Sequence, residues 1–451
     1  MIVAQARSVA LAGRAAAMVL AGTLWQSAAA QSVAVDACAA PPAPIVLDLQ
    51  LRQTPQRVEP RPREAYVDPA FGTCIVRVTD RDADLADGDD PAGIKNEYSR
   101  VQAFNADGGR FLLRSVGGGW YLYDARTLRP LAGLPLGIDP RWDAADPARI
   151  LFSDGTRLMA HLTDSGATRI VRDFATDLPG RDLAAVWTRY EGSPSADGRY
   201  WAMMAEDGDW LAAALLVYDA LKDRIVGLHP LDGWPAEARE IDSVTVSPLG
   251  TYVLAYLDRY CERGTLGSDA DPCGLMVYDR SLAQGRGLLR IVGHSDLALD
   301  AAGREVLVFQ DIDNDTIAML DLASGAVTPL LPIDFSHSPL GFHFSGQAFG
   351  RPGWAVVSTY SGGQPAAGTW MDDQVFLLEL KPGGRVVRLA HTHAVVDQAQ
   401  EHDYWAEPQA TANRDLTRIL FTSNWGRSGT QAVDTYMIVL PDDWSDALPA
   451  R

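Results

Sequence analysis

The sequence lacks the short motifs that identify several common enzyme classes. It contains no GxSxG nucleophile motif, no Walker A phosphate loop, no HExxH zinc motif and no glycine-rich dinucleotide motif. These absences exclude an assignment of function from a single local motif. A function must instead be inferred from residues that the fold brings together from distant parts of the 451-residue chain.

Long helical patterns and long apolar segments are also scarce. After residue 30, no stretch is long and apolar enough to span a bilayer as a helix. Acidic residues outnumber basic ones, 58 to 39, and the formal net charge is −19 at pH 7. A surface this acidic argues against general binding to nucleic acids or anionic membranes, although it is compatible with a local basic pocket.

The first 30 residues are typical of an export signal. Arg7 and Arg14 supply positive charge, an apolar run covers residues 15–24, and small residues precede Gln31. The apolar run is too short to serve comfortably as a membrane anchor. We therefore expect cleavage near Ala30, a net charge of −21 after the loss of both arginines, and a secreted or periplasmic protein.

The remaining chain divides into three segments by composition. Residues 31–70 are rich in Ala, Pro and Val and predict an extended N-terminal segment. Residues 71–441 predict a single domain, and residues 442–451 predict a C-terminal tail.

Only four cysteines are present, and none forms a CxxC motif. Cys261 and Cys273 flank one polar loop, so a bridge between them would close a long hairpin. Cys38 and Cys74 would then tie the N-terminal segment to the first strand. Four cysteines allow three pairings, and this pairing is the one that we favour.

A turn recurs along the chain between apolar strand patterns. Examples are Asn105-Ala106-Asp107-Gly108 and Ser195-Ala196-Asp197-Gly198, each followed by an apolar run. The mean spacing of seven such turns, from residue 107 to residue 415, is about 51 residues. This spacing suits four-stranded blades, and seven of them predict an all-β, seven-bladed β-propeller.

The two ends of the chain complement each other in this scheme. The seventh unit, around Glu401–Gly426, is one strand short, whereas the strand at Cys74–Asp80 has no unit of its own. We therefore expect this N-terminal strand to close the last blade, which leaves no free edge in the ring. The alternative is an eight-bladed ring with a degenerate first blade.

The turn segments FNADGGRFLL, PSADGRYWAM and TVSPLGTYVL resemble the TolB-like (WD40-like) bacterial propeller repeats. More narrowly, EYSRVQAFNADG and Gly293-His294 are similar to parts of oligogalacturonate and ulvan lyases, which are exported or periplasmic seven-bladed propellers. This resemblance implies an active site of axial histidine, arginine and tyrosine, with a divalent metal in the oligogalacturonate enzymes. The chain differs by having Glu407-Pro408-Gln409 where a metal-binding enzyme of that type has histidines.

In a propeller, residues that enter the first strand of each blade gather around one mouth of the central channel. They lie about eight or nine positions before each turn, and their convergence from several blades predicts a binding pocket. The rule selects Tyr98, Arg100, Trp142, Tyr190, Asp242, His294, His343, Glu407 and Gln409.

These residue types suit cleavage of an acidic polysaccharide by β-elimination. Arg100 could hold a uronate carboxylate through two hydrogen bonds. His294 or His343 could act as the base, since imidazole titrates near neutral pH, and Tyr98 or Tyr190 could act as the acid. The remaining residues of the set would bind the ligand. The alternative is that all of them are polar channel residues bonded to water and backbone.

Metal binding is a further hypothesis for one histidine-containing segment and for two acidic segments. His391, His393 and His402 lie in one segment, and a His-x-His spacing suits a divalent metal when both side chains share a strand face. Asp80–Asp90 and Asp311–Asp315 are rich in the oxygen ligands that Ca²⁺ prefers, but neither matches an EF-hand, so solvated hairpin loops are the simpler interpretation.

Two functional hypotheses follow. The first is an exported propeller without catalysis, requiring no cofactor, that binds a glycan or protein partner at its channel mouth. The second is a polysaccharide lyase that acts on uronate-containing glycans. If the selected side chains lie together in the folded protein, they can form one site. If they lie apart, they are separate channel residues.

Overall fold

The computed structural model describes residues 35–38, 45–361, 368–397, 399–430 and 432–449, without the side chains of residues 37, 401 and 402. All of them belong to one unit, residues 33–451. The predicted export signal lies outside the described residues. No helix in the described part is long and apolar enough to cross a membrane. Its short 3-10 helices are η1 (Asp36–Cys38), η2 (Phe174–Thr176), η3 (Ala236–Ala238), η4 (Glu401–Ala406) and η5 (Trp444–Ala447).

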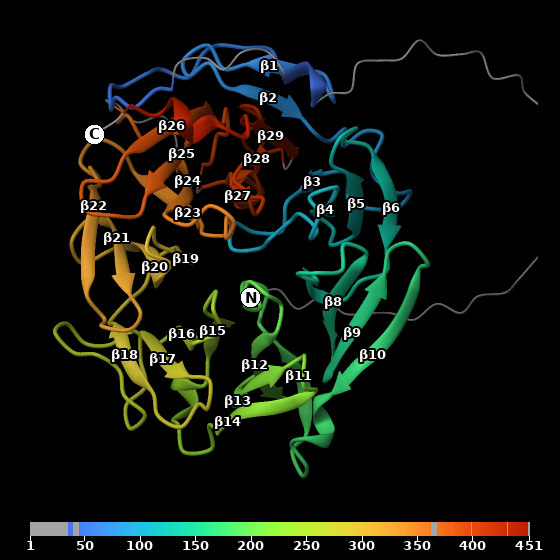
Figure 1. Cartoon of the computed structure of the whole chain (residues 1–451), viewed down its shortest axis with the longest axis vertical. Helices are drawn as coiled ribbons and strands as arrows, with labels where there is room; N and C mark the ends of the chain where they lie inside the picture. Colours follow the sequence, from blue (N-terminus) through green and yellow to red (C-terminus); the bar gives the residue numbers. More distant parts are fainter. Residues whose placement is uncertain (1–34, 39–44, 362–367, 398, 431, 450–451) are drawn as a thin grey trace, which may run out of the picture. The chain divides into compact units, whose positions relative to one another are not determined.

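Residues 65–439 form seven antiparallel sheets around a common centre (Figure 1). We number these blades in chain order. Blade 1 contains β3 (Ile94–Lys95), β4 (Arg110–Ser115), β5 (Trp120–Asp124) and β6 (Pro130–Leu134). Blade 2 contains β7 (Ile138–Trp142), β8 (Arg149–Asp154), β9 (Arg157–Leu162) and β10 (Ala167–Asp173). Blade 3 contains β11 (Leu183–Trp187), β12 (Tyr200–Asp207), β13 (Ala212–Asp219) and β14 (Arg224–Pro230).

The next three blades repeat the same order. Blade 4 contains β15 (Ile241–Val246), β16 (Tyr252–Leu257), β17 (Leu275–Asp279) and β18 (Arg286–Leu289). Blade 5 contains β19 (Ser295–Leu299), β20 (Glu305–Asp311), β21 (Thr316–Asp321) and β22 (Val327–Pro332). Blade 6 contains β23 (Leu340–Ser345), β24 (Trp354–Ser361), β25 (Gln374–Glu379) and β26 (Val386–His391). Figure 1 shows the last strand of each blade at the outside of the ring.

Both ends of the chain form blade 7. Its strands are β27 (Thr411–Ala412), β28 (Arg418–Ser423) and β29 (Asp434–Val439), followed by β2 (Cys74–Arg77) and β1 (Ala65–Val67) from the N-terminal side. The register places Cys74 opposite Val439 and Arg77 opposite Tyr436. The predicted seven-bladed, strand-closed β-propeller is thereby confirmed. The eight-bladed alternative is wrong, because the isolated strand belongs to the last blade.

The recurring turn has one structural cause in five of the blades. A polar side chain at its start accepts a hydrogen bond from a backbone N–H four or five residues later, which fixes the turn before the next strand. The distance is 2.9 Å in each case, for the pairs Asn105–Arg110, Ser195–Tyr200, Ser247–Tyr252, Asp300–Arg304 and Asn413–Arg418. The turn motif therefore recurs in the sequence because the same local hydrogen bond recurs in these blades.

Neighbouring blades pack face to face through the apolar side chains that alternate along their strands. Met204 and Leu215 of blade 3, for example, share one buried cluster with Val244 and Val253 of blade 4. Burial of each such aliphatic side chain contributes about 1.5–3 kcal/mol relative to exposure. The core is thus a set of inter-blade layers, which leaves the polar ends of the inner strands for the channel.

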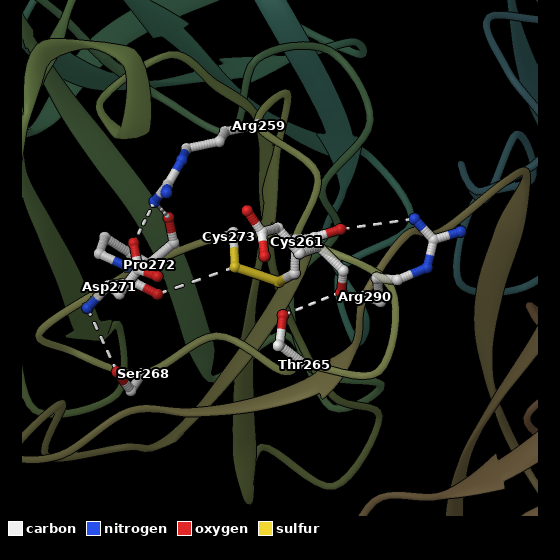
Figure 2. The surroundings of a disulfide bond; sticks show 9 residues. Arg259, Cys261, Thr265, Ser268, Asp271, Pro272, Cys273 and Arg290 are labelled. Atoms are coloured by element: carbon white, nitrogen blue, oxygen red, sulfur yellow. Dashed lines mark hydrogen bonds and ion pairs between the residues drawn. A yellow bond between two sulfur atoms is a disulfide. The ribbon is translucent and has the colours of Figure 1, made fainter.

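Both predicted disulfides are confirmed. Cys38 and Cys74 are bonded, with their Cα atoms 5.6 Å apart, and so are Cys261 and Cys273, with a Cα separation of 5.1 Å. Figure 2 shows Arg259 and Arg290 around the second bridge, where they donate to the carbonyl oxygens of Pro272 (2.8 Å) and Cys261 (3.4 Å). The first bridge joins the N-terminal segment to the strand that closes the ring.

Two inner strands, those of blades 1 and 3, are interrupted. In blade 1, Lys95 pairs with Arg114, and the ladder resumes only at Ala103, whose carbonyl accepts from the Leu112 amide at 2.9 Å. Residues 96–102 leave the sheet, and we call them channel loop 1. In blade 3, residues 188–194 leave the sheet between Trp187 and Ser195, and we call them channel loop 3.

Candidate functional site at the channel mouth

Channel loop 1 crosses the centre of the ring and contacts other blades. The carbonyl of Arg100 accepts a hydrogen bond from Ser193 of channel loop 3 at 3.0 Å. The carbonyl of Val101 accepts one from Thr411 of blade 7 at 2.8 Å. The two loops therefore carry their side chains into the space that regular inner strands would leave open.

Five of the sequence-selected residues meet here. The hydroxyl of Tyr98 and Nδ1 of His294 form a 3.2 Å hydrogen bond, although blades 1 and 5 lie far apart along the ring. The rings of His294 and His343 have centroids 4.5 Å apart, and Nε2 of His343 donates to Glu407 at 2.8 Å. With Arg100 and its partner Glu191, we call this group the mouth cluster.

Arg100 is held by Glu191, which the sequence analysis did not select. Its Nη1 lies 2.8 Å from Oε2 of Glu191, and its guanidinium lies 4.9 Å from the centre of the Tyr256 ring. Glu191 follows Tyr190 directly, so the position rule missed it by one residue. The rule assumes a regular strand, whereas the backbone of Tyr190 has a positive φ of 71° within channel loop 3.

The surroundings of the mouth cluster set its protonation states. Burial lowers the pKa of His294 well below its ordinary value, and the nearby charges of His343 and Arg100 act in the same direction. Burial also raises the pKa of the Tyr98 phenol well above its ordinary value. At neutral pH the cluster therefore pairs a neutral imidazole with a protonated phenol.

Glu191 and His343 complete the electrostatics of the cluster. Burial raises the pKa of Glu191, because protein surrounds the carboxyl even though part of its side chain reaches solvent, while the charge of Arg100 opposes this shift. Nδ1 of His343 is buried and has no hydrogen-bond partner among the described residues. The cluster thus holds one buried nitrogen atom that a ligand or water can satisfy.

The other selected residues lie apart from this group. Trp142 is buried between blades and donates from its indole nitrogen to the carbonyl of Ala103 at 2.9 Å. Asp242 is exposed, and Tyr190 is half-exposed with its ring edge-on to Trp187 at 5.1 Å. These three contribute to packing or to the rim, and the ligand-binding roles assigned to them stay predictions.

Gln409 binds a lysine that the sequence analysis missed. Its Oε1 accepts from Nζ of Lys95 at 2.6 Å, and the same ammonium donates to the carbonyls of Asn96 (2.8 Å) and Glu97 (3.0 Å). Lys95 ends β3 immediately before channel loop 1. Its position just outside the expected strand explains why the spacing rule passed over it.

Three half-exposed aromatic rings, which we call the aromatic rim, come from segments near the mouth cluster. The side chains of Tyr190, Trp210 and Tyr404 are 49, 56 and 50% exposed. Trp210 lies 6.0 Å from Trp187, which also contacts Tyr190, while the charge of Glu191 influences the pKa of Tyr404. Large rings that remain half-exposed beside buried polar groups are suited to binding a ligand with both apolar and polar faces.

The space along the channel itself is small. A cavity of about 10 Å³ is lined by Arg100, Glu191, Tyr256 and Asp296, and a second one of about 20 Å³ by Trp142, Phe349 and Arg414, among other residues. Volumes of this size hold about one water molecule.

The histidines considered for metal binding face different partners. His391 is buried, with Nδ1 3.3 Å from Asp68 and Nε2 3.2 Å from the carbonyl oxygen of Arg52. His393 stacks on Trp425 at 4.1 Å, and the side chain of His402 lies outside the described residues. Among the residues described, no three His, Cys, Asp or Glu side chains gather as metal donors. The donor set that the lyase resemblance implies is therefore not matched.

The two acidic segments use their carboxylates within the protein. Asp84 pairs with Arg63, and Asp89 accepts hydrogen bonds from Ser115 (2.9 Å) and Tyr121 (2.6 Å). In the second segment, Asp313 pairs with Arg290 at 2.5 Å. These three carboxylates therefore have partners within the protein, and Ca²⁺ binding at the two segments stays a prediction.

Comparison with known proteins defines the fold. No protein-family model matches the sequence, and no curated protein matches it significantly. The structure is similar to oligogalacturonate lyase from Vibrio parahaemolyticus, with a TM-score of 0.55 and 12% identity over 84% of this chain and 97% of that one. At this identity the similarity shows a shared propeller fold.

Two further structures are less similar. The β-propeller domain of Cps50 (Swd1) from Myceliophteria thermophila has a TM-score of 0.43 and 14% identity, covering 77% of this chain and 97% of that chain. Hydrazine synthase from Kuenenia stuttgartiensis has a TM-score of 0.44 and 12% identity, covering 78% and 98%.

Proposed function

We propose that the protein is an exported β-propeller that binds a glycan at the mouth of its channel. The observation that carries this proposal is the set of three half-exposed aromatic side chains, Tyr190, Trp210 and Tyr404, near a cluster of hydrogen-bonding groups. Sugar rings offer apolar C–H faces and polar hydroxyl edges, and this combination of surfaces complements both. Two disulfides support the assignment to an oxidising compartment.

The test compares two substitutions in blade 3. Trp210→Ala removes a rim ring, whereas Leu221→Ala removes a side chain that is 75% exposed and is not part of the rim. Binding to a panel of neutral and acidic polysaccharides is measured by affinity electrophoresis and calorimetry. We expect Trp210→Ala to weaken binding about 3- to 10-fold, in line with loss of one aromatic contact, and Leu221→Ala to leave it unchanged. Wild-type protein that binds no member of the panel would refute the proposal.

A second candidate function, β-elimination of a uronate-containing glycan, is favoured by the Tyr98–His294 pair. In this reaction Nε2 of His294 takes the C5 proton, the C4–O bond breaks, and Tyr98 gives its proton to the leaving oxygen. The proton on Nδ1 of His294 then returns to the Tyr98 oxygen along their 3.2 Å hydrogen bond. The base must be neutral, as the lowered pKa of His294 provides.

The lyase candidate has its own test. The new C4=C5 double bond absorbs in the ultraviolet, so turnover is followed by absorbance on each uronate polymer. We expect both His294→Ala and Tyr98→Phe to abolish turnover while the unfolding temperature changes little. Binding of a polyuronate without any rise in absorbance would retain the binding proposal and reject the lyase.

A further inference from the structure

Lysine is rare in this chain. One lysine lies beside an arginine, and neither of the two has a carboxylate partner among the described residues. The three lysines are Lys95, Lys222 and Lys381. Lys95 is 1% exposed, and its three hydrogen bonds go to neutral oxygens. Among the described residues, no carboxylate lies within ion-pairing distance of it. Acids are abundant in this sequence, so the missing partner is unusual.

Arg114 lies directly opposite Lys95. The two residues are register partners in the β3–β4 ladder, so their side chains leave the same face of blade 1. Like charges directly opposite each other destabilise a sheet. Arg114 also has no ion-pair partner among the described residues, and its buried Nε has no hydrogen-bond acceptor. Its guanidinium packs 5.7 Å from the centre of the Trp120 ring.

Neighbouring carboxylates are occupied elsewhere. Glu97 is close enough to interact with the charges of Lys95 and Arg114, but it forms its ion pair with Arg141 at 2.9 Å. Glu407 also acts on Lys95 and is hydrogen-bonded to His343. The pair of cations therefore keeps uncompensated positive charge, and burial together with the Arg114 charge lowers the pKa of Lys95 to about 7.

The charge of Arg114 also reaches two rings of the rim. It influences the pKa of both Tyr190 and Tyr404, which stand on different blades. Arg100, in contrast, is already neutralised by Glu191 at 2.8 Å. The sequence pattern favoured Arg100 for the recognition of an acidic group, but Arg100 is paired, whereas Arg114 has no ion-pair partner among the described residues.

We propose that Arg114, with Lys95 behind it, forms the subsite that recognises a negatively charged group of the bound glycan. A carboxylate or a sulfate ester presents two oxygen atoms that match the planar guanidinium, and the second cation adds charge from the sheet beneath. The inference rests on the proposed glycan binding, but the subsite can be tested without a polysaccharide.

The first experiment measures affinity for galacturonate oligomers and for their uncharged methyl esters by calorimetry at fixed ionic strength. Wild type, Arg114→Gln, Arg114→Lys and the control Arg129→Gln are compared. Arg129 is exposed on the same blade and makes no side-chain hydrogen bond or ion pair with a described residue. We expect the acid to bind wild type and the control at least tenfold better than the ester. Arg114→Gln should lose this preference, and Arg114→Lys should keep part of it.

The same affinity measurement is repeated with a sulfated galactan and its desulfated form. Discrimination between these two, with none between galacturonate and its ester, would assign the subsite to sulfate esters. An Arg114→Gln variant that still prefers acids would overturn the subsite while leaving glycan binding intact. Equal binding of acids and esters by wild type would overturn it as well.

The second experiment remains decisive even if no glycan binds. With only three lysines, ¹³C-lysine NMR resolves Lys95, which is assigned by elimination with Lys222→Arg and Lys381→Arg. Acetate and sulfate are the probes, with chloride holding the ionic strength constant. We expect either anion to raise the titration midpoint of Lys95 in wild type but not in Arg114→Gln. No rise in wild type would reject the subsite independently of the proposed function.

Discussion

In the closing seam of blade 7, buried cations have carboxylate partners. Asp434 is buried between Arg77 (2.9 Å) and Arg81, and Glu59 pairs with Arg427 at 2.8 Å. At the channel mouth, Lys95 and Arg114 have no such partner among the described residues. The seam resembles a structural network in which charge is balanced internally. The mouth keeps an imbalance that stability alone does not require, and this difference supports the subsite proposed there.

The largest expected effect breaks the seam. Arg77→Gln removes a buried guanidinium that bonds Asp434 and the carbonyls of Pro60 (3.2 Å) and Thr79 (3.1 Å). We expect it to lower the free energy of unfolding by about 3–5 kcal/mol, the usual cost of breaking a buried ion pair. Thermal and urea denaturation measure the loss. A variant as stable as wild type would show that the seam is not a structural network.

The disulfide of the seam should have the next largest effect. Cys38 and Cys74 are 36 residues apart, whereas Cys261 and Cys273 are 12 apart. Loop-closure entropy gives a loss of about 4 kcal/mol for the first bridge and about 3 kcal/mol for the second. Unfolding of the two double-serine variants compares them directly. A larger loss at the hairpin bridge would contradict the importance of the seam.

Replacing a charged residue of the mouth cluster by an uncharged one should lower the free energy of unfolding by less than the two changes in the seam. Glu407→Gln removes the charge that faces His343 at 2.8 Å but keeps an oxygen that can accept from Nε2. We expect a loss of about 1–2 kcal/mol in stability, typical of one charge-assisted hydrogen bond. Denaturation of this variant beside Arg77→Gln makes the comparison. An equal loss of stability in both variants would mean that the mouth contributes as much to stability as the seam does.

The pH dependence of stability gives a further comparison of the mouth with the seam, because Lys95 titrates at the mouth. Its pKa falls from 10.5 to about 7 on folding, so the unfolded chain binds more protons between these values. The contribution of this residue is therefore destabilising below about pH 7, and the penalty is relieved as the pH rises toward 10.5. Lysine NMR should give a midpoint near 7. A midpoint near 10 would show that the ammonium is compensated after all.

The smallest effect on stability is expected at Arg114. Arg114→Gln removes a cation that faces another cation, so the free energy of unfolding should change by no more than about 0.5 kcal/mol. The same substitution at Arg77 provides the matched comparison. A loss of several kcal/mol at Arg114 would place it in a structural network and contradict its assignment to ligand binding.

The fold was largely predictable because its signals are local. The turn that begins with Asn105 or Ser195 recurs because one side chain bonds a nearby amide in the same blade. Counting these turns predicted seven blades, and the unpaired strand at Cys74 predicted the closure. The pairing of the four cysteines followed from the same arrangement.

Five residues of the mouth cluster were selected from the sequence, and two of them, Tyr98 and Arg100, lie on channel loop 1 instead of a regular strand. His343, which was selected by position, lies on β23, and its ring contacts those of Tyr98 and His294. Glu191 was missed by one position because channel loop 3 departs from a regular strand, and Lys95 was missed because it lies on β3, before channel loop 1. Which arginine has a carboxylate partner depends on distances across the ring, so no spacing rule could separate Arg100 from Arg114.

Closure by β2 also sets the order in which the fold can be completed. Cys74 pairs with Val439, so the strand that is synthesised first finds its partner only after nearly the whole chain exists. Blades 1 to 6 are built from contiguous segments and can form as each is made, whereas blade 7 must wait. Until then, β2 presents an unpaired edge that other chains can bind. Completion of blade 7 is therefore the step at which assembly with a wrong partner competes with correct folding.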